Sequence, residues 1–216
     1  MRLTTWTLTA GPTLENRVCT TPGMWRDRLV AITPGCTLPV ACSGCLAILA
    51  AASQSIWLRD PQQQLGHYLS LWIGVAVVSF LSQLAEMALR SRASGSVNVR
   101  NMAFLVVEQF IPSVIAGGLL TFVLATFAPD AVWMLPGLWQ LLFALGMFAV
   151  HRLLPKGLFW VAAFYMLSGV VCLSLAQGPA ALSPWAMGVP FGVGQLATAA
   201  VLYWTLERND EERQTA

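Results

Sequence analysis

The chain has 216 residues, of which 56% are hydrophobic and only 10% are charged, and its mean hydropathy is +0.65. Soluble domains carry about 25% charged residues, so this composition excludes an ordinary soluble protein and indicates a membrane protein. The formal net charge is only +2, but the 12 Lys and Arg residues gather in a few polar stretches between long apolar runs. The placement of the charges is therefore more informative than their sum.

The first 35 residues form a polar segment that Pro and Gly interrupt repeatedly. Gly11-Pro12, Pro22-Gly23 and Pro34-Gly35 each disfavour a long helix. The segment lacks the apolar core that a cleavable signal peptide needs, so the first long apolar run should remain as an anchor. We expect residues 1–35 to be an irregular arm on the cytoplasmic side.

Six apolar runs follow, and each can cross about 30 Å of hydrocarbon as a helix at about 1.5 Å per residue. Lipid cannot bond exposed backbone groups, so such runs must be helical. The predicted spans cover about residues 36–58, 67–89, 103–127, 131–150, 157–176 and 185–206, and a polar tail follows at 207–216. The sequence therefore predicts an all-α fold, an integral membrane bundle of six transmembrane helices within residues 36–206.

Basic residues predict the orientation of these spans. Of the 12 Lys and Arg residues, Arg59 alone lies on one side, and the remaining eleven lie on the other. Lys and Arg accumulate on the cytoplasmic side of membrane proteins, so both termini are expected in the cytoplasm (N-in/C-in). Tryptophans agree with this orientation, since Trp57 and Trp185 fall at predicted outer ends and Trp160 and Trp204 at predicted inner ends.

A polar cluster is predicted at the cytoplasmic end of the second and third spans. Its members are Gln83, Glu86, Arg90, Arg100, Glu108 and Gln109. Spacings of three and four place the first three on one helix face. An ionised carboxylate is costly in hydrocarbon, so each Glu should be paired, protonated, or turned toward water or the bundle interior. Arg90 and Arg100 are the expected partners. The cluster is interpreted either as a structural clamp or as a proton- or cation-responsive site.

The five cysteines include a Cys42-Ser43-Gly44-Cys45 spacing on the first span. A redox motif of this type opens a helix after a strand, and a zinc site needs two further ligands, but His67 and His151 are predicted on opposite sides of the membrane. We therefore expect no metal and no cofactor. Small residues every four positions on this span favour helix packing instead, namely Ser43, Ala47, Ala51 and Ser55.

Small residues also mark the third and sixth spans. Gly117 lies in a stripe with Ser113, Thr121 and Ala125, and Gly188 and Gly192 form a Gly-x-x-x-Gly pair beside Pro190. This pattern is typical of close helix contacts with a local kink. The alternative is a broken helix that borders a substrate site, with Pro112 and Pro190 related across two oppositely oriented halves.

Three motifs resemble a known family. They are Leu-Pro-Gly-x-Trp at 135–139, Phe-Tyr-Met-Leu-Ser-Gly at 164–169 and Gly-x-Pro-Phe-Gly-x-Gly-Gln at 188–195. Across about residues 67–206 the chain is similar to an uncharacterised family of predicted multi-pass (six-span) bacterial inner-membrane proteins. The resemblance implies a six-span fold in a bacterial inner membrane and no particular reaction. The family has a histidine near the position of Gln195, so a role for a titrating imidazole there is not expected.

Motifs for catalysis are missing from the sequence. It contains no phosphate-binding Gly-rich loop ending in Lys-Ser/Thr, no His-Glu-x-x-His and no Gly-x-Ser-x-Gly. Basic residues are also too dispersed for a nucleic-acid surface. We expect a non-enzymatic accessory, regulatory or scaffolding protein of the lipid bilayer that forms a homo-oligomer or binds a cytoplasmic protein. The alternative is a small transporter or channel whose path Glu86 and Glu108 line together with Gln83, Gln109, Gln140 and Gln195. A membrane-embedded enzyme ranks third.

Overall fold

The computed structural model describes residues 37–58, 61, 63–93, 97–151, 153, 155–175, 180 and 182–207. Within these ranges the regular elements are helices: α2 (Thr37–Trp57), α3 (Leu65–Ala93), α4 (Val97–Phe127), α5 (Leu135–Val150), α6 (Gly157–Leu175) and α7 (Pro184–Leu202), with the short 3-10 helix η2 (Pro129–Met134) and the π-helical turn η4 (Tyr203–Glu207). The predicted arm at 1–35 and residues 208–216 of the predicted tail lie outside the described residues.

Six helices in the described ranges are long and apolar enough to cross a membrane, which confirms the prediction of six helices of spanning length and composition. One difference in detail concerns the fourth span, which starts with η2 before α5 begins at Leu135. Pro136 lies in the first turn of α5, where a proline is tolerated because the N–H that it lacks would have no helical partner.

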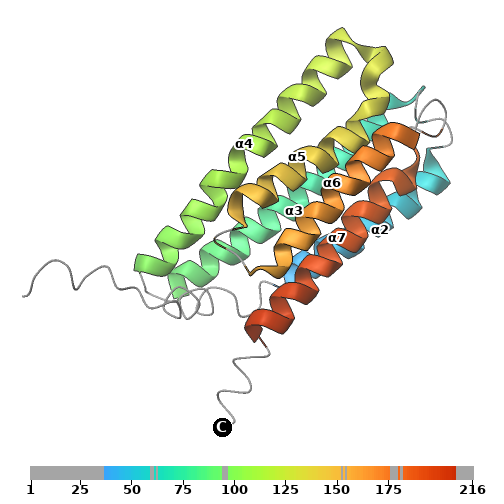
Figure 1. The fold of residues 1–216 in the computed structure, drawn as a ribbon. Helices are drawn as coiled ribbons and strands as arrows, with labels where there is room; N and C mark the ends of the chain where they lie inside the picture. The colour runs from blue at the N-terminus through green and yellow to red at the C-terminus, as the bar shows by residue number, and fades with distance from the viewer. Residues whose placement is uncertain are drawn as a thin grey trace, which may run out of the picture.

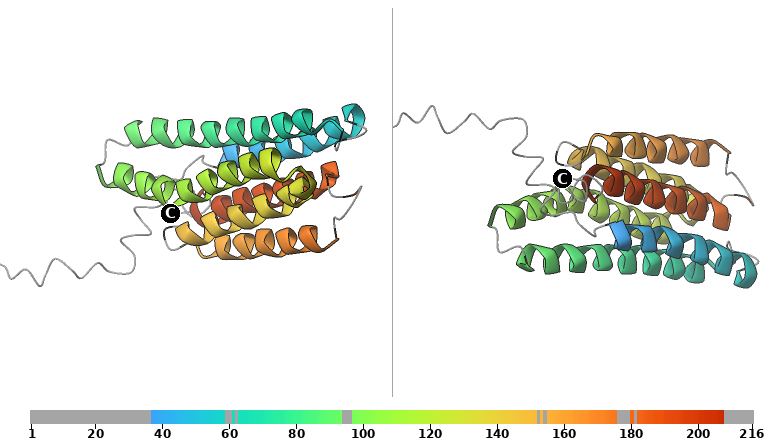
Figure 2. Two further views of the ribbon diagram at one scale, coloured as in Figure 1. Left: turned by 90° about the horizontal axis from the view of Figure 1, so that it is seen from above. Right: turned by 90° about the horizontal axis from the view of Figure 1, so that it is seen from below.

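The six helices run lengthwise beside one another, as Figures 1 and 2 show, and their contacts follow a ring. Each helix contacts the next one along the chain, and α2 and α7 close the ring with the most extensive contact of all. A further contact joins α5 to α7 across the ring. The first and last spans therefore hold the bundle together.

Small residues shape the contact between α2 and α7. A Cβ atom added to Gly44 would lie 3.0 Å from the carbonyl oxygen of Gly192, and one added to Gly192 would lie 2.6 Å from Cγ1 of Ile48. A Cβ on Gly188 would overlap with the methyl group of Ala51. Lipid tails are as apolar as side chains, so helices in a membrane associate by close packing, which small residues permit. Gly188 and Gly192, two of the predicted packing residues, lie at this contact.

Gly117, the third predicted packing residue, has a looser environment. It faces α5, but a Cβ added to it would lie 3.8 Å from Cδ1 of Leu142, an ordinary van der Waals separation. The contact between α4 and α5 is closer at Gly146, where an added Cβ would lie 2.7 Å from the ring of Phe110.

Aromatic rings fill the space where α5, α6 and α7 meet. The ring centroid of Phe143 lies 4.7 Å from that of Tyr165 and 5.6 Å from that of Phe191, and the last two are 5.4 Å apart. Tyr165 also lies directly against Gly194. Offset and edge-to-face arrangements of this kind stabilise a packed core beyond the burial of area. The interior at this level is therefore solid.

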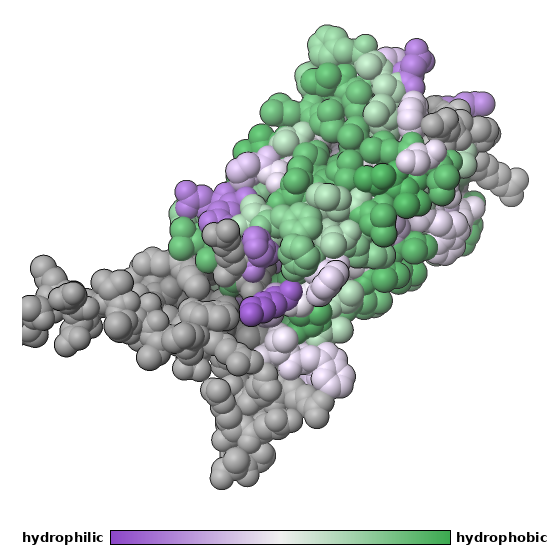
Figure 3. Space-filling model, in the orientation of Figure 1, coloured by the Kyte–Doolittle hydropathy of each residue, from purple (hydrophilic) through white to green (hydrophobic). Residues whose placement is uncertain are grey.

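Helices α3 and α4 are peripheral to this core. Only 11% of the α3 span and 6% of the α4 span is buried, compared with 28% to 44% for the other four spans. Large apolar side chains cover the outside of the bundle, and Figure 3 shows that the hydrophilic residues on the visible face gather toward the two ends. Such a surface suits a hydrocarbon environment.

Exposed tryptophans lie at both ends of the bundle. Trp57 ends α2 and Trp185 begins α7 at one end, whereas Trp160 near the start of α6 and Trp204 in η4 lie at the other. Amphipathic indole rings concentrate at the two membrane–water interfaces, so this arrangement indicates where the bilayer surfaces meet the helices.

We predict that Gly188→Ala destabilises the protein by about 1–3 kcal/mol, because the added methyl group overpacks the contact with Ala51. The matched control is Gly117→Ala. It should be neutral, or stabilising by up to about 1 kcal/mol, because alanine has the higher helix propensity and the added Cβ finds room. Unfolding in a titration of denaturing detergent measures both. Equal effects of the two variants would contradict the assigned packing.

Candidate functional site

The predicted polar residues of α3 lie on the side of that helix that faces the bundle. Gln83 and Glu86 are half-buried, and spacings of three and four residues put them on the same face as the buried Tyr68 and Trp72. Burial along this face decreases from Trp72 toward Glu86. The polar residues therefore lie where α3 packs less tightly.

The predicted polar residues of α4 have different surroundings. Glu108 and Gln109 are exposed, although Glu108 lies one turn inside a span that begins at Phe104. The side of α4 that faces α5 carries Phe110 and Ser113 instead. One of the alternatives expected from the sequence was that Glu108 faces the bundle interior. The structure does not place it there. The expected pairing with Arg90 and Arg100 falls on side chains outside the described part of the chain.

A buried polar layer near the start of α7 escaped the sequence-based prediction. We define the polar layer as Gln54, Trp72, Thr121, Trp139 and Gln140. Its residues come from α2, α3, α4 and α5, and three of them are almost completely buried. Its side-chain hydrogen bonds join different helices.

Gln54 is the hub of the polar layer on one side. Its side chain is 1% exposed. Its amide Nε2 donates to the carbonyl of Leu182 at 2.9 Å, and its Oε1 accepts from the indole Nε1 of Trp72 at 2.8 Å. A single amide therefore joins α2, α3 and the segment that leads into α7. Buried polar groups are costly unless they are bonded in this way.

Gln140 on α5 compensates for a proline on α7. In an α-helix the carbonyl of Ala186 would accept from the backbone N–H four residues later, but that residue is Pro190, which has none. The amide Nε2 of Gln140 donates to this carbonyl at 2.8 Å. The fully buried Gln140 thus supplies the hydrogen bond that α7 cannot form within itself.

The polar layer also ties α4 to the bundle. The indole Nε1 of Trp139 on α5 donates to the hydroxyl of Thr121 at 2.8 Å, and that hydroxyl donates to the carbonyl of Gly117 at 2.7 Å. Both peripheral helices are therefore held by an indole hydrogen bond near the same end of the bundle, α3 through Trp72 and α4 through Trp139.

Three buried polar atoms have no hydrogen-bond partner among the described residues: the hydroxyls of Tyr68 and Tyr165 and Oε1 of Gln140. Buried polar atoms are normally bonded to protein or to ordered water. The interior therefore holds hydrogen-bonding capacity that neighbouring side chains do not use.

The chemistry available in the polar layer is limited to hydrogen bonding. Its members carry amide, indole and hydroxyl groups and no carboxylate or imidazole. In the described ranges no three His, Cys, Asp or Glu side chains converge on a position that could hold a metal ion. Cys42 and Cys45 are exposed on α2, and neither forms a disulfide within the described ranges. The arrangement is suited to positioning helices.

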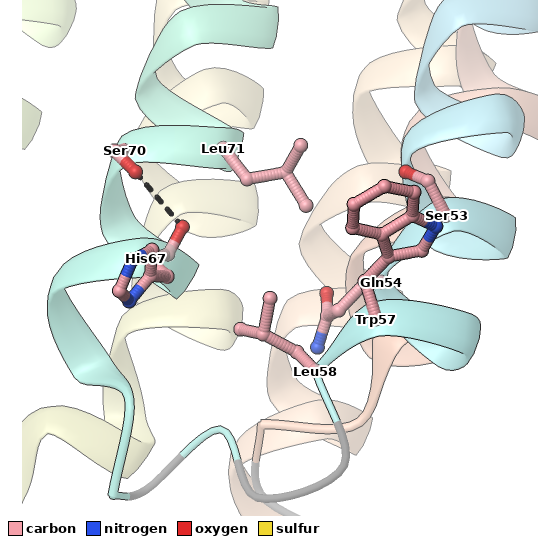
Figure 4. A pocket seen from close by; sticks show the side chains of 7 residues that line it. All are labelled: Ser53, Gln54, Trp57, Leu58, His67, Ser70 and Leu71. Atoms are coloured by element: carbon pink, nitrogen blue, oxygen red, sulfur yellow. Dashed lines mark hydrogen bonds between the residues drawn. The ribbon is translucent and has the colours of Figure 1, made fainter.

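A pocket of about 340 Å³ lies between the end of α2 and the start of α3. Figure 4 shows Trp57 and Gln54 on the α2 side and His67 and Ser70 on α3, with Leu71 between the two helices. The hydroxyl of Ser70 is bonded to the carbonyl of His67 at 3.0 Å, and the amide of Gln54 is engaged in the polar layer. The walls are mainly apolar, and the pocket contains none of the predicted site residues.

Sequence signals for the polar layer exist but are incomplete. A glutamine within an apolar run, such as Gln54 or Gln140, needs a buried partner, and Pro190 leaves one carbonyl without its donor. Neither signal says which residue is the partner. The bond from Gln54 to Leu182 spans 128 positions of sequence, so local periodicity cannot reveal it.

Comparisons with models of protein families, with curated proteins and with solved structures find no match for this chain. Fold and composition therefore define the class on their own: the described residues form a six-helix, all-α bundle with the features of a multi-pass membrane protein. The family resemblance of residues 67–206 stays a prediction.

We predict that Gln140→Leu destabilises the protein by about 1–3 kcal/mol, because it leaves the carbonyl of Ala186 buried without a donor. Pro190→Ala restores a backbone N–H at the correct position. The double variant should therefore recover most of the stability lost in the Gln140→Leu variant, whereas Pro190→Ala alone should have a smaller effect.

A double-mutant cycle on the free energy of unfolding measures this coupling. The Gln140→Leu substitution should lower the free energy of unfolding less when residue 190 is alanine than when it is proline. If the two effects simply add, the amide of Gln140 does not replace the missing backbone bond.

Proposed function

We propose that the protein is a non-enzymatic, multi-pass bacterial inner-membrane protein that acts as an accessory, regulatory or scaffolding component through its membrane-embedded surface. One observation carries the proposal. Glu108 and Gln109, polar residues at membrane depth, are exposed on α4, the least buried of the six spans. Polar groups on such a surface favour association with another polypeptide, because bonding there replaces costly contact with lipid.

The packing of the interior supports the same proposal. The rings of Phe143, Tyr165 and Phe191 fill the junction of α5, α6 and α7. Most hydrogen bonds of the polar layer join one helix to another. Close packing of this kind favours a rigid scaffold over a conducting path.

A small transporter or channel is the second candidate. It is favoured by the unused hydrogen-bonding capacity of Tyr68 and Gln140 and by the half-buried position of Glu86. Against it, the six residues proposed to line a path lie in different environments. Gln140 and Gln195 are buried, whereas Glu108 and Gln109 are exposed on α4.

The proposed orientation places both termini in the cytoplasm. It is supported by the eleven Lys and Arg residues that share one side of the predicted spans, out of 12 in the chain. The connection between α2 and α3 then faces outward, and the connection between α5 and α6 faces the cytoplasm.

The accessory role predicts a stoichiometric partner. Affinity purification from native membranes in a mild detergent should yield a complex whose mass exceeds that of one or two copies of the 23.4 kDa chain, with a second protein in constant ratio. Mass spectrometry of the intact complex measures this. A preparation that contains only this chain would contradict the accessory role. It would not decide whether copies of the chain bind one another.

The transporter candidate predicts a different result. Proteoliposomes containing the wild-type chain would then show solute or proton flux above that of empty liposomes, and Glu86→Gln or Glu108→Gln would lower it. The accessory role predicts equal flux for the two variants, the wild type and empty liposomes.

The orientation predicts which connections a membrane-impermeant thiol reagent reaches. Gln63 between α2 and α3 and Lys156 between α5 and α6 are both exposed, so each is a suitable site for a single cysteine in a cysteine-free background. Gln63→Cys should be labelled in intact cells, and Lys156→Cys only after permeabilisation. The reverse pattern would show that the orientation is inverted.

A further inference from the structure

Among the contacts between neighbouring helices of the ring, the contact between α3 and α4 is the least extensive. Each packs mainly on its other neighbour, α3 on α2 and α4 on α5, and they contact each other little. Figures 1 and 2 show the two helices along one side of the bundle. Because 11% or less of either span is buried, both carry a large surface that no part of the described chain covers.

Glycines distinguish these two helices from the rest. Of the 12 described glycines, eight would bring an added Cβ to within 3.0 Å of another helix or its side chains, and Gly117 has an ordinary contact at 3.8 Å. The other three, Gly66, Gly74 and Gly118, have nothing within 4 Å, and all three lie on α3 or α4. Small residues are enriched where membrane helices pack closely, so these three favour contact with a helix that the described part of the chain does not supply.

The exposed face of α3 carries small residues in its first half and a cation at its far end. Spacings of three, four and seven residues align its members, which are all exposed: Gly66, Ser70, Gly74, Val77, Leu81, Ala85 and Arg92. The first three form a small-x-x-x-small repeat, and Arg92 lies in the last turn of the helix. This face therefore offers a shallow surface around Gly66, Ser70 and Gly74, larger apolar side chains beyond them, and a positive charge at its end.

The exposed face of α4 is bulky and carries an anion. Its members repeat at spacings of four and three along the helix, opposite the side that meets α5: Phe104, Glu108, Ile111, Ile115, Gly118 and Phe122. This spacing is that of a seam at which two helices pack at a small crossing angle. The face therefore offers large apolar side chains and a negative charge.

The two faces match in depth. The α3 span runs from Leu65 to Leu89 and the α4 span runs back from Phe104 to Phe127. Leu65 and Phe127 are the span ends that lie on the same side of the membrane. Gly74 lies nine residues from Leu65, and Gly118 lies nine residues from Phe127. Counted from the same two ends, Arg92 lies 27 residues along α3 and Glu108 lies 19 residues back along α4, so at about 1.5 Å per residue they are about 12 Å apart along the axis. Extended Arg and Glu side chains cover that distance between them.

We propose that two copies of this chain associate through the exposed faces of α3 and α4, with α3 of each copy against α4 of the other. A two-fold axis normal to the membrane generates both contacts at once, as isologous interfaces require. The bulky side chains around Phe122 pack over the glycines of α3, and Glu108 pairs with Arg92 of the second copy. Complementary charge and shape on the same side of the molecule favour a second copy over lipid. The inference shares the exposed Glu108 on α4 with the proposed accessory role, but it concerns copies of this chain alone, so its test does not depend on a second protein.

Disulfide cross-linking between differently tagged copies tests the arrangement. One copy carries Gly74→Cys and the other Gly118→Cys, both in a background without the native cysteines. After oxidation in native membranes, a product with both tags and about twice the mass of the chain is expected. The control pair is Leu49→Cys on α2 with Leu167→Cys on α6. Leu49 and Leu167 are exposed to the same extent as each other, and this pair should yield several-fold less cross-linked product.

A charge exchange provides a second readout that does not depend on cysteine chemistry. Glu108→Arg or Arg92→Glu alone should lower the dimer fraction about tenfold, the effect expected for a close charge pair at an interface. The double variant should regain most of the dimer, which also shows that the single variants do not merely fail to fold. Single-molecule photobleaching in liposomes measures the fraction.

Four outcomes would overturn the proposal. A chain that is monomeric in liposomes excludes it, as does a control pair that cross-links as well as the test pair. A double variant that folds but does not recover the dimer excludes the pairing of α3 with α4. Photo-cross-linking from Ile115 that reaches only lipid or a different protein assigns this face to another occupant.

Discussion

The contact between α2 and α7 is the constraint on which the rest of the bundle depends. In hydrocarbon the helices gain little from excluding water, so their association relies on close packing and on hydrogen bonds. Gly44, Gly188 and Gly192 let the first and last spans approach until backbone meets side chain. This contact closes the ring and brings α7 within reach of Gln54 on one side and Gln140 on the other. A larger residue at these glycines would separate the helices and break both bonds.

The bundle is held unevenly along its length. Near the start of α7, Trp72 ties α3 to α2 and Trp139 ties α5 to α4, so both peripheral helices are anchored at that end. At the opposite end Glu86 is only half-buried and Glu108 is exposed. The polar layer thus fixes the helices where it lies, and the membrane-depth carboxylates occupy the end where the peripheral helices are bound least.

The number of spans and their approximate limits could be predicted from the sequence, because hydropathy and length are local properties. The small residues at Gly188 and Gly192 were also recognisable, since a spacing of four defines a helix face. Their partner helix was not, because periodicity gives a face and not the element that meets it. The same limit applies to Glu108, whose spacing fits an inward or an outward position equally well. Gln54 and Gln140 depend on partners far along the chain, so their roles required the folded structure.

Pro190 gives α7 an unusual position in the assembly of the protein. A membrane helix normally satisfies its own backbone before it meets any neighbour, so each span can enter the bilayer by itself. Because of Pro190, α7 leaves the carbonyl of Ala186 without a donor until the amide of Gln140 reaches it. The span that carries the donor is synthesised first, since α5 precedes α7 in the chain. The helix that closes the ring against α2 is therefore also the one whose backbone hydrogen bonding depends on a neighbour.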